Sequence, residues 1–420
     1  MSTRRAQISG LPTRLAIQSW AVLAGLAAGC SSGGFLLDVP DAGRPPQDLA
    51  LTPDLRRPQD ASVDLRSPLS DKLALSAPVA YAVGSLPFFL QVADVNGDGK
   101  LDVLTSGGSV YSLLGNGDGT LQAASPLGSG GGYHVGVADL NGDTRPDLVV
   151  GVGGGAQVYL TKAEGGFAAP SKVVVGTTGV SIGLGDVQGD GIVDLAVGDY
   201  AGSGDHAAYV LLGRGDGSFG PPVQVKTEPN PHALLLADLN HDGRLDLATA
   251  NYGAESVTVA LGLGDGRFLP PQNLSGEPAP IEVRAADLNL DGHVDLIAGS
   301  ERSNMLSIHL GRGDGTFLPV QRLAVTGERN TYGLAVDDVN GDGVADIVVC
   351  SANNGTQISV LLGLGDGSFR PPVSFSAGND TFSIGIADLN GDGLKDIAVS
   401  NASSPSQVTV LLNRSPLPPR

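Results

Sequence analysis

Short apolar runs alternate with polar, glycine-rich stretches along most of the chain. Runs such as FFLQVA from Phe88 and VTVALG from Val257 are rich in β-branched or aromatic residues, a composition typical of strands. Two polar signatures separate the runs: an aspartate-rich stretch and a turn of the form Gly-x-Gly-Asp-Gly. The repeated order predicts units of four antiparallel strands, with the aspartate-rich loop after the first strand and the Gly-Asp-Gly turn after the third.

The unit recurs seven times. The aspartates that open the seven aspartate-rich stretches are 45, 47, 52, 49, 51 and 50 positions apart. Four antiparallel strands in a repeat of this length are typical of one propeller blade, and four to eight blades close a ring. The pattern therefore predicts an all-β fold, a seven-bladed β-propeller of four-stranded antiparallel blades.

The last unit stops before its fourth strand. Counting 19 positions back from an opening aspartate leads from Asp388 to Phe369, and from Asp94 to Leu75. The segment LSAPV from Leu75 aligns without gaps on FRPPV from Phe369. We therefore expect residues 75–83 to complete the last blade, which closes the ring and removes an open sheet edge.

The aspartate-rich stretches carry the candidate chemistry. In DVNGDGKLD from Asp94, side chains with carboxylate or amide oxygens occupy positions 1, 3, 5 and 9. The EF-hand loop supplies calcium with oxygens from positions 1, 3, 5, 7 and 9 and turns at a glycine in position 6. The flanking runs are strands here, and Thr105 stands where an EF-hand has its bidentate glutamate. A solvated acidic turn is therefore the alternative for any single copy.

Repetition favours metal binding over the solvated turn. Positions 1, 5 and 9 are Asp in all seven stretches, and position 3 is Asn in six and Gln188 in the third. Every ligand is a hard oxygen, which favours calcium, up to seven ions. The second loop is expected to be the weakest, because Thr144 replaces the glycine and Pro146 stiffens position 8. The predicted metal-binding residues, with position 7 contributing its carbonyl, are Asp94, Asn96, Asp98, Lys100 and Asp102; Asp139, Asn141, Asp143, Arg145 and Asp147; Asp186, Gln188, Asp190, Ile192 and Asp194; Asp238, Asn240, Asp242, Arg244 and Asp246; Asp287, Asn289, Asp291, His293 and Asp295; Asp338, Asn340, Asp342, Val344 and Asp346; and Asp388, Asn390, Asp392, Leu394 and Asp396.

The net charge adds little to the functional interpretation once the acidic residues of these loops are counted. The 420 residues carry a formal net charge of −19, and the seven loops hold 21 of the 44 acidic residues. No basic patch is present, so a nucleic-acid partner is not expected. Nothing in the pattern calls for a second subunit, and we expect a monomer.

The N-terminal region differs from the repeats. Residues 1–29 have a basic start and a short apolar run, as in a secretory signal peptide. The sequence LAAGC, ending at Cys30, resembles the lipobox of bacterial lipoproteins, which implies cleavage before Cys30 and a lipid anchor on it; an ordinary signal peptide is the alternative. Ser31 favours the outer membrane, again by resemblance. Residues 30–70 are rich in Pro and Asp and are expected to be a disordered tether, which leaves 71–416 for the propeller.

Loops of the form D-x-N-x-D-G-x-x-D in blades of about 50 residues resemble the FG-GAP and VCBS repeat family, whose best-known members are integrin alpha-chain propellers. The resemblance covers roughly residues 71–416. It implies calcium in the hairpins between the first and second strands, and it leaves the ligand open.

Three functional classes remain. A surface binding or adhesion module for a protein or polysaccharide fits the lipid anchor and the tether best. The alternatives are a propeller-fold enzyme such as a polysaccharide lyase or hydrolase, and an envelope assembly scaffold. No Ser-His-Asp or paired-carboxylate spacing occurs outside the metal loops, so no catalytic residue is predicted. Candidate ligand-binding residues around the ring axis are Tyr133, His134, His232 and Tyr332, and simple packing at a narrow channel is their alternative role.

Overall fold

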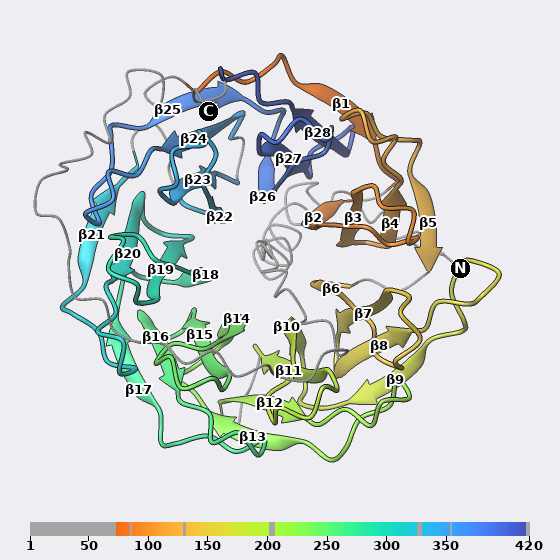
Figure 1. Cartoon of the computed structure of the whole chain (residues 1–420), viewed down its shortest axis with the longest axis vertical. Coiled ribbons are helices and arrows are strands. Elements are labelled where there is room, and N and C mark those ends of the chain that lie inside the picture. The colour runs from red at the N-terminus through yellow and green to blue at the C-terminus, as the bar shows by residue number, and fades with distance from the viewer. Residues whose placement is uncertain are drawn as a thin grey trace, which may run out of the picture.

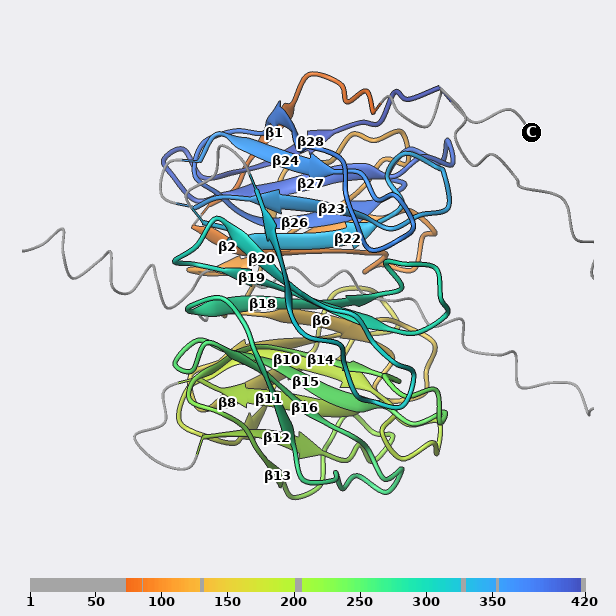
Figure 2. The ribbon, with the colours of Figure 1, turned by 90° about the vertical axis from the view of Figure 1, so that its left-hand side faces the viewer.

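The computed structural model describes residues 73–84, 86–128, 132–200, 206–325, 330–352 and 355–416. Cys30, the signal peptide and the tether lie outside the described residues. The described residues form seven four-stranded antiparallel sheets, arranged as blades of a ring (Figure 1). Seen from the side, the ring is a disc whose strands cross its thickness (Figure 2). The predicted all-β, seven-bladed propeller is confirmed.

Each blade contributes strands in order from the axis to the rim. The innermost strands are β2 (Pro87–Ala93), β6 (Val135–Ala138), β10 (Gly179–Gly185), β14 (Pro231–Ala237), β18 (Pro280–Ala286), β22 (Gly333–Asp337) and β26 (Thr381–Ala387). The second strands are β3 (Asp102–Gly107), β7 (Asp147–Val152), β11 (Asp194–Asp199), β15 (Asp246–Asn251), β19 (Asp295–Ser300), β23 (Asp346–Cys350) and β27 (Asp396–Asn401). The third strands are β4 (Val110–Leu113), β8 (Gly155–Tyr159), β12 (Ala207–Leu211), β16 (Ser256–Ala260), β20 (Met305–His309), β24 (Gln357–Leu361) and β28 (Gln407–Leu411). The outer strands are β5 (Ser125–Gly128), β9 (Ser171–Val174), β13 (Val223–Lys226), β17 (Gln272–Ser275), β21 (Gln321–Ala324), β25 (Val373–Ser376) and β1 (Val79–Ala82).

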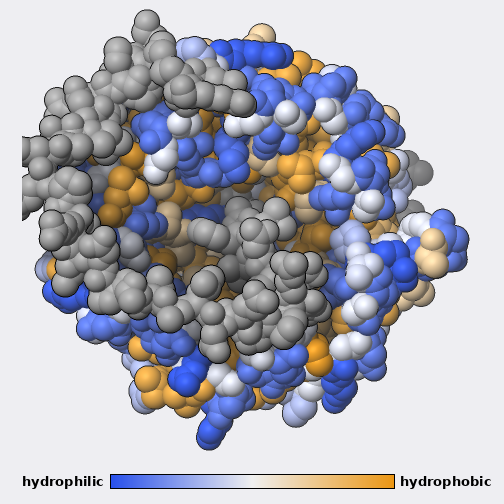
Figure 3. All heavy atoms as spheres, viewed as in Figure 1, coloured by the Kyte–Doolittle hydropathy of each residue, from blue (hydrophilic) through white to orange (hydrophobic). Residues whose placement is uncertain are grey.

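The core lies between successive blades. Second strands such as β7 and β11 are buried along their whole length, because both of their faces pack against neighbouring blades. One cluster joins Leu288, Ile297 and Leu306 of the fifth blade to Leu334 and Ile347 of the sixth. Outer strands such as β9 and β25 are largely exposed. Figure 3 shows hydrophilic residues along much of the rim of one face, with hydrophobic patches between them.

Both ends of the described chain meet in the seventh blade. Strand β1 pairs antiparallel with β28, and Leu75 forms a further bridge with Asn413. The Leu75–Asn413 bridge matches the Gly363–Phe369 bridge of the sixth blade, as the alignment of Leu75 with Phe369 predicted. The predicted closure of the ring by the N-terminal strand is confirmed.

Side chains also tie the innermost strands of neighbouring blades together. The Leu90 N–H of β2 donates to Ser383 Oγ of β26 (3.1 Å). The Ile182 N–H of β10 donates to Nδ1 of His134, just before β6 (2.9 Å). No helix in the described part of the chain is long and apolar enough to cross a membrane.

Candidate metal centres

The seven aspartate-rich loops join the innermost strand of each blade to the second strand. Several Gly-Asp-Gly turns contact the loop of the preceding blade on the same face of the ring. The Gly119 N–H donates to the Leu389 carbonyl (3.1 Å), and the Gly217 N–H donates to the Leu140 carbonyl (3.0 Å). The turn of one blade therefore supports the loop of its neighbour.

All seven loops share one backbone conformation, with positive φ at positions four and six. Most of these positions are glycine. His241 and Leu290, at position four, have φ of 59° and 58°, and Thr144, at position six of the second loop, has φ of 65°. A left-handed conformation costs a non-glycine residue about 1–2 kcal/mol. Thr144 therefore adopts the same backbone conformation as the glycines at this position, at a cost in stability.

Hydrogen bonds organise the first six positions, as the first loop illustrates. Asp94 Oδ1 accepts the Gly97 N–H (2.7 Å), and its Oδ2 accepts the Gly99 N–H (2.8 Å). Asn96 Oδ1 accepts the Asp98 N–H (2.9 Å), and Asn96 Nδ2 donates to Asp98 Oδ2 (3.3 Å). The side chains at positions one, three and five are therefore gathered around one short turn.

The ninth-position aspartate is a main-chain anchor. Asp102 is fully buried; its Oδ2 accepts the Val95 N–H (3.0 Å), and its Oδ1 accepts the Gly115 N–H beyond the third strand (2.7 Å). Burial raises the pKa of all seven ninth-position carboxyls, although the main-chain hydrogen bonds lower it; Asp246 reaches about 6 and Asp346 about 7. This anchoring role is one that the spacing did not reveal. The other six pairs of main-chain bonds belong to Asp147, Asp194, Asp246, Asp295, Asp346 and Asp396.

In the described residues, no group of three or more His, Cys, Asp or Glu side chains is arranged to hold a metal ion. The anchoring of the ninth-position aspartate explains part of this absence of a formed metal site, because both of its oxygens bind main-chain N–H groups. Each carboxylate oxygen has two lone pairs, so one such contact still leaves a lone pair for a cation. The metal-binding role of the 35 residues stays a prediction.

Two features of the loops fit a cation. Asp287 Oδ1, at position one of the fifth loop, is buried and has no hydrogen-bond partner among the described residues. A buried carboxylate oxygen without a partner is unfavourable unless a cation compensates it. In the second loop, the Arg145 guanidinium forms an ion pair with the position-five carboxylate of Asp143, so a positive charge already lies beside that oxygen. The side-chain oxygens at positions one, three and five and the position-seven carbonyl are hard ligands of the kind calcium takes.

The candidate ligand-binding residues lie in packed surroundings around the ring axis. His134, His232 and Tyr332 are buried, and Tyr133 is partly exposed. The Tyr332 ring packs edge-on against Phe382 at 5.3 Å. Burial lowers the pKa of His134 to about 3 and that of His232 to about 4, which keeps both imidazoles neutral. These contacts fit the alternative role of the residues, packing at a narrow channel. Their ligand-binding role stays a prediction.

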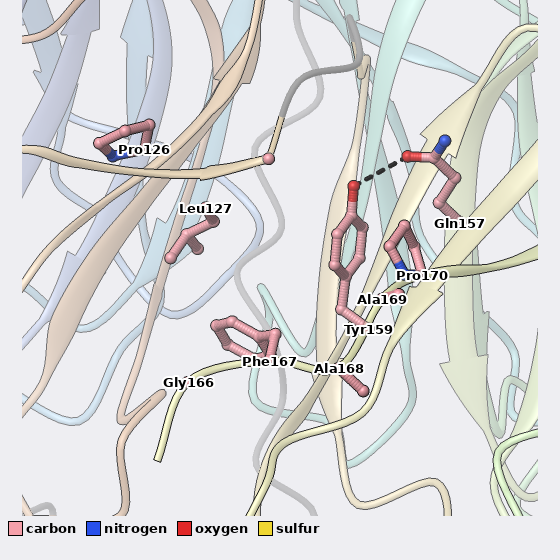
Figure 4. A pocket seen from close by; sticks show the side chains of 10 residues that line it. Pro126, Leu127, Gln157, Tyr159, Gly166, Phe167, Ala168, Ala169 and Pro170 are labelled. Atoms are coloured by element: carbon pink, nitrogen blue, oxygen red, sulfur yellow. Dashed lines mark hydrogen bonds between the residues drawn. The ribbon is translucent and has the colours of Figure 1, made fainter.

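A cavity at the rim was not foreseen from the sequence. It has a volume of about 480 Å³ and lies between β5 of the first blade and, in the second blade, β8 and the segment 166–170 that precedes β9 (Figure 4). Leu127, Phe167 and Tyr159 line it, with the Tyr159 and Phe167 rings edge-on at 6.4 Å. The Tyr159 hydroxyl donates to Gln157 Oε1 (2.9 Å). The departure of the second blade from the Gly-Asp-Gly turn, at residues 161–167, was a local signal near this cavity that the blade differs.

Comparisons with known proteins agree with the repeat pattern. The family model described as FG-GAP-like repeat matches residues 94–150, 139–197, 186–249, 238–298, 287–349 and 338–399. Integrin alpha-IIb of Homo sapiens is 34% identical over 156 residues, which are 30% of this chain and 15% of the integrin, so the chain spans a small part of that relative's length.

Two solved structures share the fold. A complex of BBS1N with ARL6DN superposes with a TM-score of 0.57 at 12% identity, covering 82% of this chain and 98% of the other. An Agrocybe aegerita lectin, described as recognising non-reducing terminal N-acetylglucosamine, superposes with a TM-score of 0.50 at 21% identity, covering 71% of this chain and 80% of the lectin. At these identities the similarity concerns the fold alone.

Proposed function

Because this chain belongs to the family of FG-GAP-like repeats, we propose that it is a calcium-stabilised β-propeller that serves as a binding module for a protein or polysaccharide at the cell envelope. The buried, unpartnered Oδ1 of Asp287 carries the calcium part of the proposal. The similarity of one part of the chain to integrin alpha-IIb supports the binding part.

Calcium would be held by the side-chain oxygens at positions one, three and five and by the position-seven carbonyl of a loop. A bound ion would neutralise carboxylates that repel one another and would cross-link the turn. A catalytic metal is more often single and keeps an open coordination position. The recurrence of the loop in every blade therefore supports a structural role for the ions.

The aspartate-rich loops and the Gly-Asp-Gly turns occupy one face of the ring. The proposed binding surface is the other face, where the second strand of each blade ends. Tyr252 follows the second strand of the fourth blade, and Arg302 follows that of the fifth. The Arg302 guanidinium lies 5.3 Å from the centre of the Tyr252 ring, and its Nη2 donates to the Tyr252 hydroxyl (3.2 Å). Tyr and Arg are enriched in binding surfaces, since each combines a large contact area with directed polar groups.

Attachment to the envelope is the part of the proposal that rests on the sequence alone. The lipobox-like LAAGC ends at Cys30, and about 40 residues separate Cys30 from the expected start of the propeller at residue 71. A flexible segment of that length spans tens of ångströms. The propeller would therefore reach beyond the membrane surface while staying anchored to it, in keeping with the outer membrane that Ser31 favours.

A pull-down from intact envelopes tests the binding role. The full-length protein is used as bait in calcium and in EDTA, beside Arg302→Ala and the control Arg214→Ala, an exposed arginine in a Gly-Asp-Gly turn. We expect one protein or polysaccharide to be retained in calcium, lost in EDTA and weakened by Arg302→Ala alone. Equal retention by all baits, or no retained partner, would contradict the proposal.

A further inference from the structure

The position-five carboxylate of the second loop has a different hydrogen-bond donor from its counterparts in the other six loops. In those six, the carboxylate Oδ2 accepts a hydrogen bond from the amide side chain at position three, at 2.6–3.3 Å. In the second loop, Asp143 Oδ2 instead accepts from Nη2 of Arg145, the position-seven residue. The guanidinium of Arg145 therefore takes the place that the amide of Asn141 would have as donor to this oxygen.

Thr161 of the second blade binds Arg145, and Pro146 and Asp147 in turn bind Thr161. Its Nε donates to the carbonyl of Thr161 (3.4 Å), and the Thr161 hydroxyl donates to the carbonyl of Pro146. The Thr161 N–H donates to Oδ1 of the ninth-position Asp147 (2.7 Å). In five other blades, glycine stands where this blade has Thr161. These contacts tie the arginine to the residue that follows β8, and that residue to the start of β7.

An arginine at position seven is not sufficient for this arrangement. Arg244 has the same position in the fourth loop, but its Nη1 lies 3.8 Å from Asp242 Oδ2. Asn240 Nδ2 keeps its bond to that oxygen (3.2 Å), as in the other loops. The fourth loop therefore provides a natural control for the second.

We propose that Arg145 is the resident cation of the second loop, so that the protein takes up calcium at no more than six of its seven loops. The inference rests on the proposed calcium binding. A guanidinium bound to a carboxylate supplies a positive charge where a calcium ion would otherwise do so, and it is present at every calcium concentration. Calcium would have to displace the arginine before it could use Asp143.

A local consequence follows at the contact between the second and third blades. The Gly217 N–H of the third blade donates to the carbonyl of Leu140, the second residue of this loop. The Gly119 N–H makes the equivalent bond to Leu389 in the seventh loop, which has no such arginine. Calcium removal should therefore loosen the Gly119 contact and spare the Gly217 contact.

Counting bound ions in the full chain tests the proposal, by calorimetric titration with calcium alone after EDTA treatment. We expect six ions in the wild type, seven in Arg145→Gln, six in the control Arg244→Gln and five in Asp392→Ala. Seven ions in the wild type would overturn the inference, whether or not the variants fold, and so would six in a folded Arg145→Gln. No calcium bound by any form would contradict the proposed calcium binding itself, and is thereby distinguished from a failure of the inference alone.

Hydrogen exchange gives a second readout. In EDTA, the Gly217 amide should stay protected in the wild type and exchange at least tenfold faster in Arg145→Gln. The Gly119 amide should exchange fast in EDTA in both proteins. Equal loss of protection at the two amides of the wild type would contradict a resident cation in the second loop.

Discussion

Leu75 forms an antiparallel bridge with Asn413, and the Leu412 N–H donates to Ser76 Oγ beside it (2.9 Å). These contacts hold the two ends of the described chain in one blade. The stability of the whole ring therefore depends on a short segment before the first repeat.

Deletion of residues 71–84 should destabilise the propeller far more than deletion of residues 31–68. The first deletion removes β1 and exposes the edge of β28, with a loss of several backbone hydrogen bonds at about 1 kcal/mol each. We expect a melting temperature lower by on the order of 10 °C for the first deletion and nearly unchanged for the second. Equal melting temperatures in scanning calorimetry would rule out this closure.

Thr144→Gly should stabilise the protein, because Thr144 has a φ of 65° that glycine adopts without strain. The expected gain is about 1 kcal/mol in the free energy of unfolding. Lys100→Gly is the control: the φ of Lys100 is not positive, so glycine there only adds freedom to the unfolded chain. Urea unfolding in EDTA measures both, and a destabilised Thr144→Gly would count against the shared loop conformation.

The buried His134 should make the protein less stable below pH 6.5. Burial, assisted by the charge of Arg284, lowers the folded-state pKa to about 3 from the ordinary 6.5. Between these values the unfolded chain binds a proton that the folded protein excludes, so stability rises with pH across this window.

His134→Gln removes this dependence. From pH 7 to pH 5 the wild type should lose about 2 kcal/mol relative to the variant, since each pKa unit corresponds to about 1.4 kcal/mol. Urea unfolding at both pH values, in EDTA, gives the difference. An equal change in the free energy of unfolding of the two proteins would show that the imidazole is not buried in its neutral form.

Cys30→Ala should abolish lipid attachment. If LAAGC is a lipobox, labelled fatty acid enters the wild type and not the variant, and the variant leaves the membrane fraction. Equal labelling of both proteins would end this interpretation of the N-terminal region.

The sequence was sufficient to predict the architecture because strands, turns and their period are local signals. The 19-residue interval that places Leu75 opposite Asn413 is also visible along the chain. The role of Asp102 could not be found in this way, since its partner Gly115 lies beyond two further strands. Spacing indicates which residues share a loop, but not which main-chain groups their oxygens reach.

The rim cavity and the bond between Arg145 and Asp143 escaped sequence reasoning for the same reason. Leu127 and Phe167 come from different blades and meet only through the order of blades around the ring. Arg145 and Arg244 have the same position in their loops, yet only Arg145 comes within hydrogen-bond distance of its aspartate. The carbonyl of Thr161, across the hairpin, accepts from Arg145 and adds to this difference.

Calorimetry with and without EDTA tests the central claim most directly. At millimolar calcium, a site with a Kd of about 10–100 μM adds about 1.4–2.7 kcal/mol to the stability of the folded state. Several such sites would rival the whole stability of an ordinary domain, about 5–15 kcal/mol. We therefore predict a steep fall of the melting temperature in EDTA, restored by calcium and poorly by magnesium, which retains its waters and needs six short bonds. An unchanged melting temperature would mean that the seven loops are acidic turns that bind no calcium.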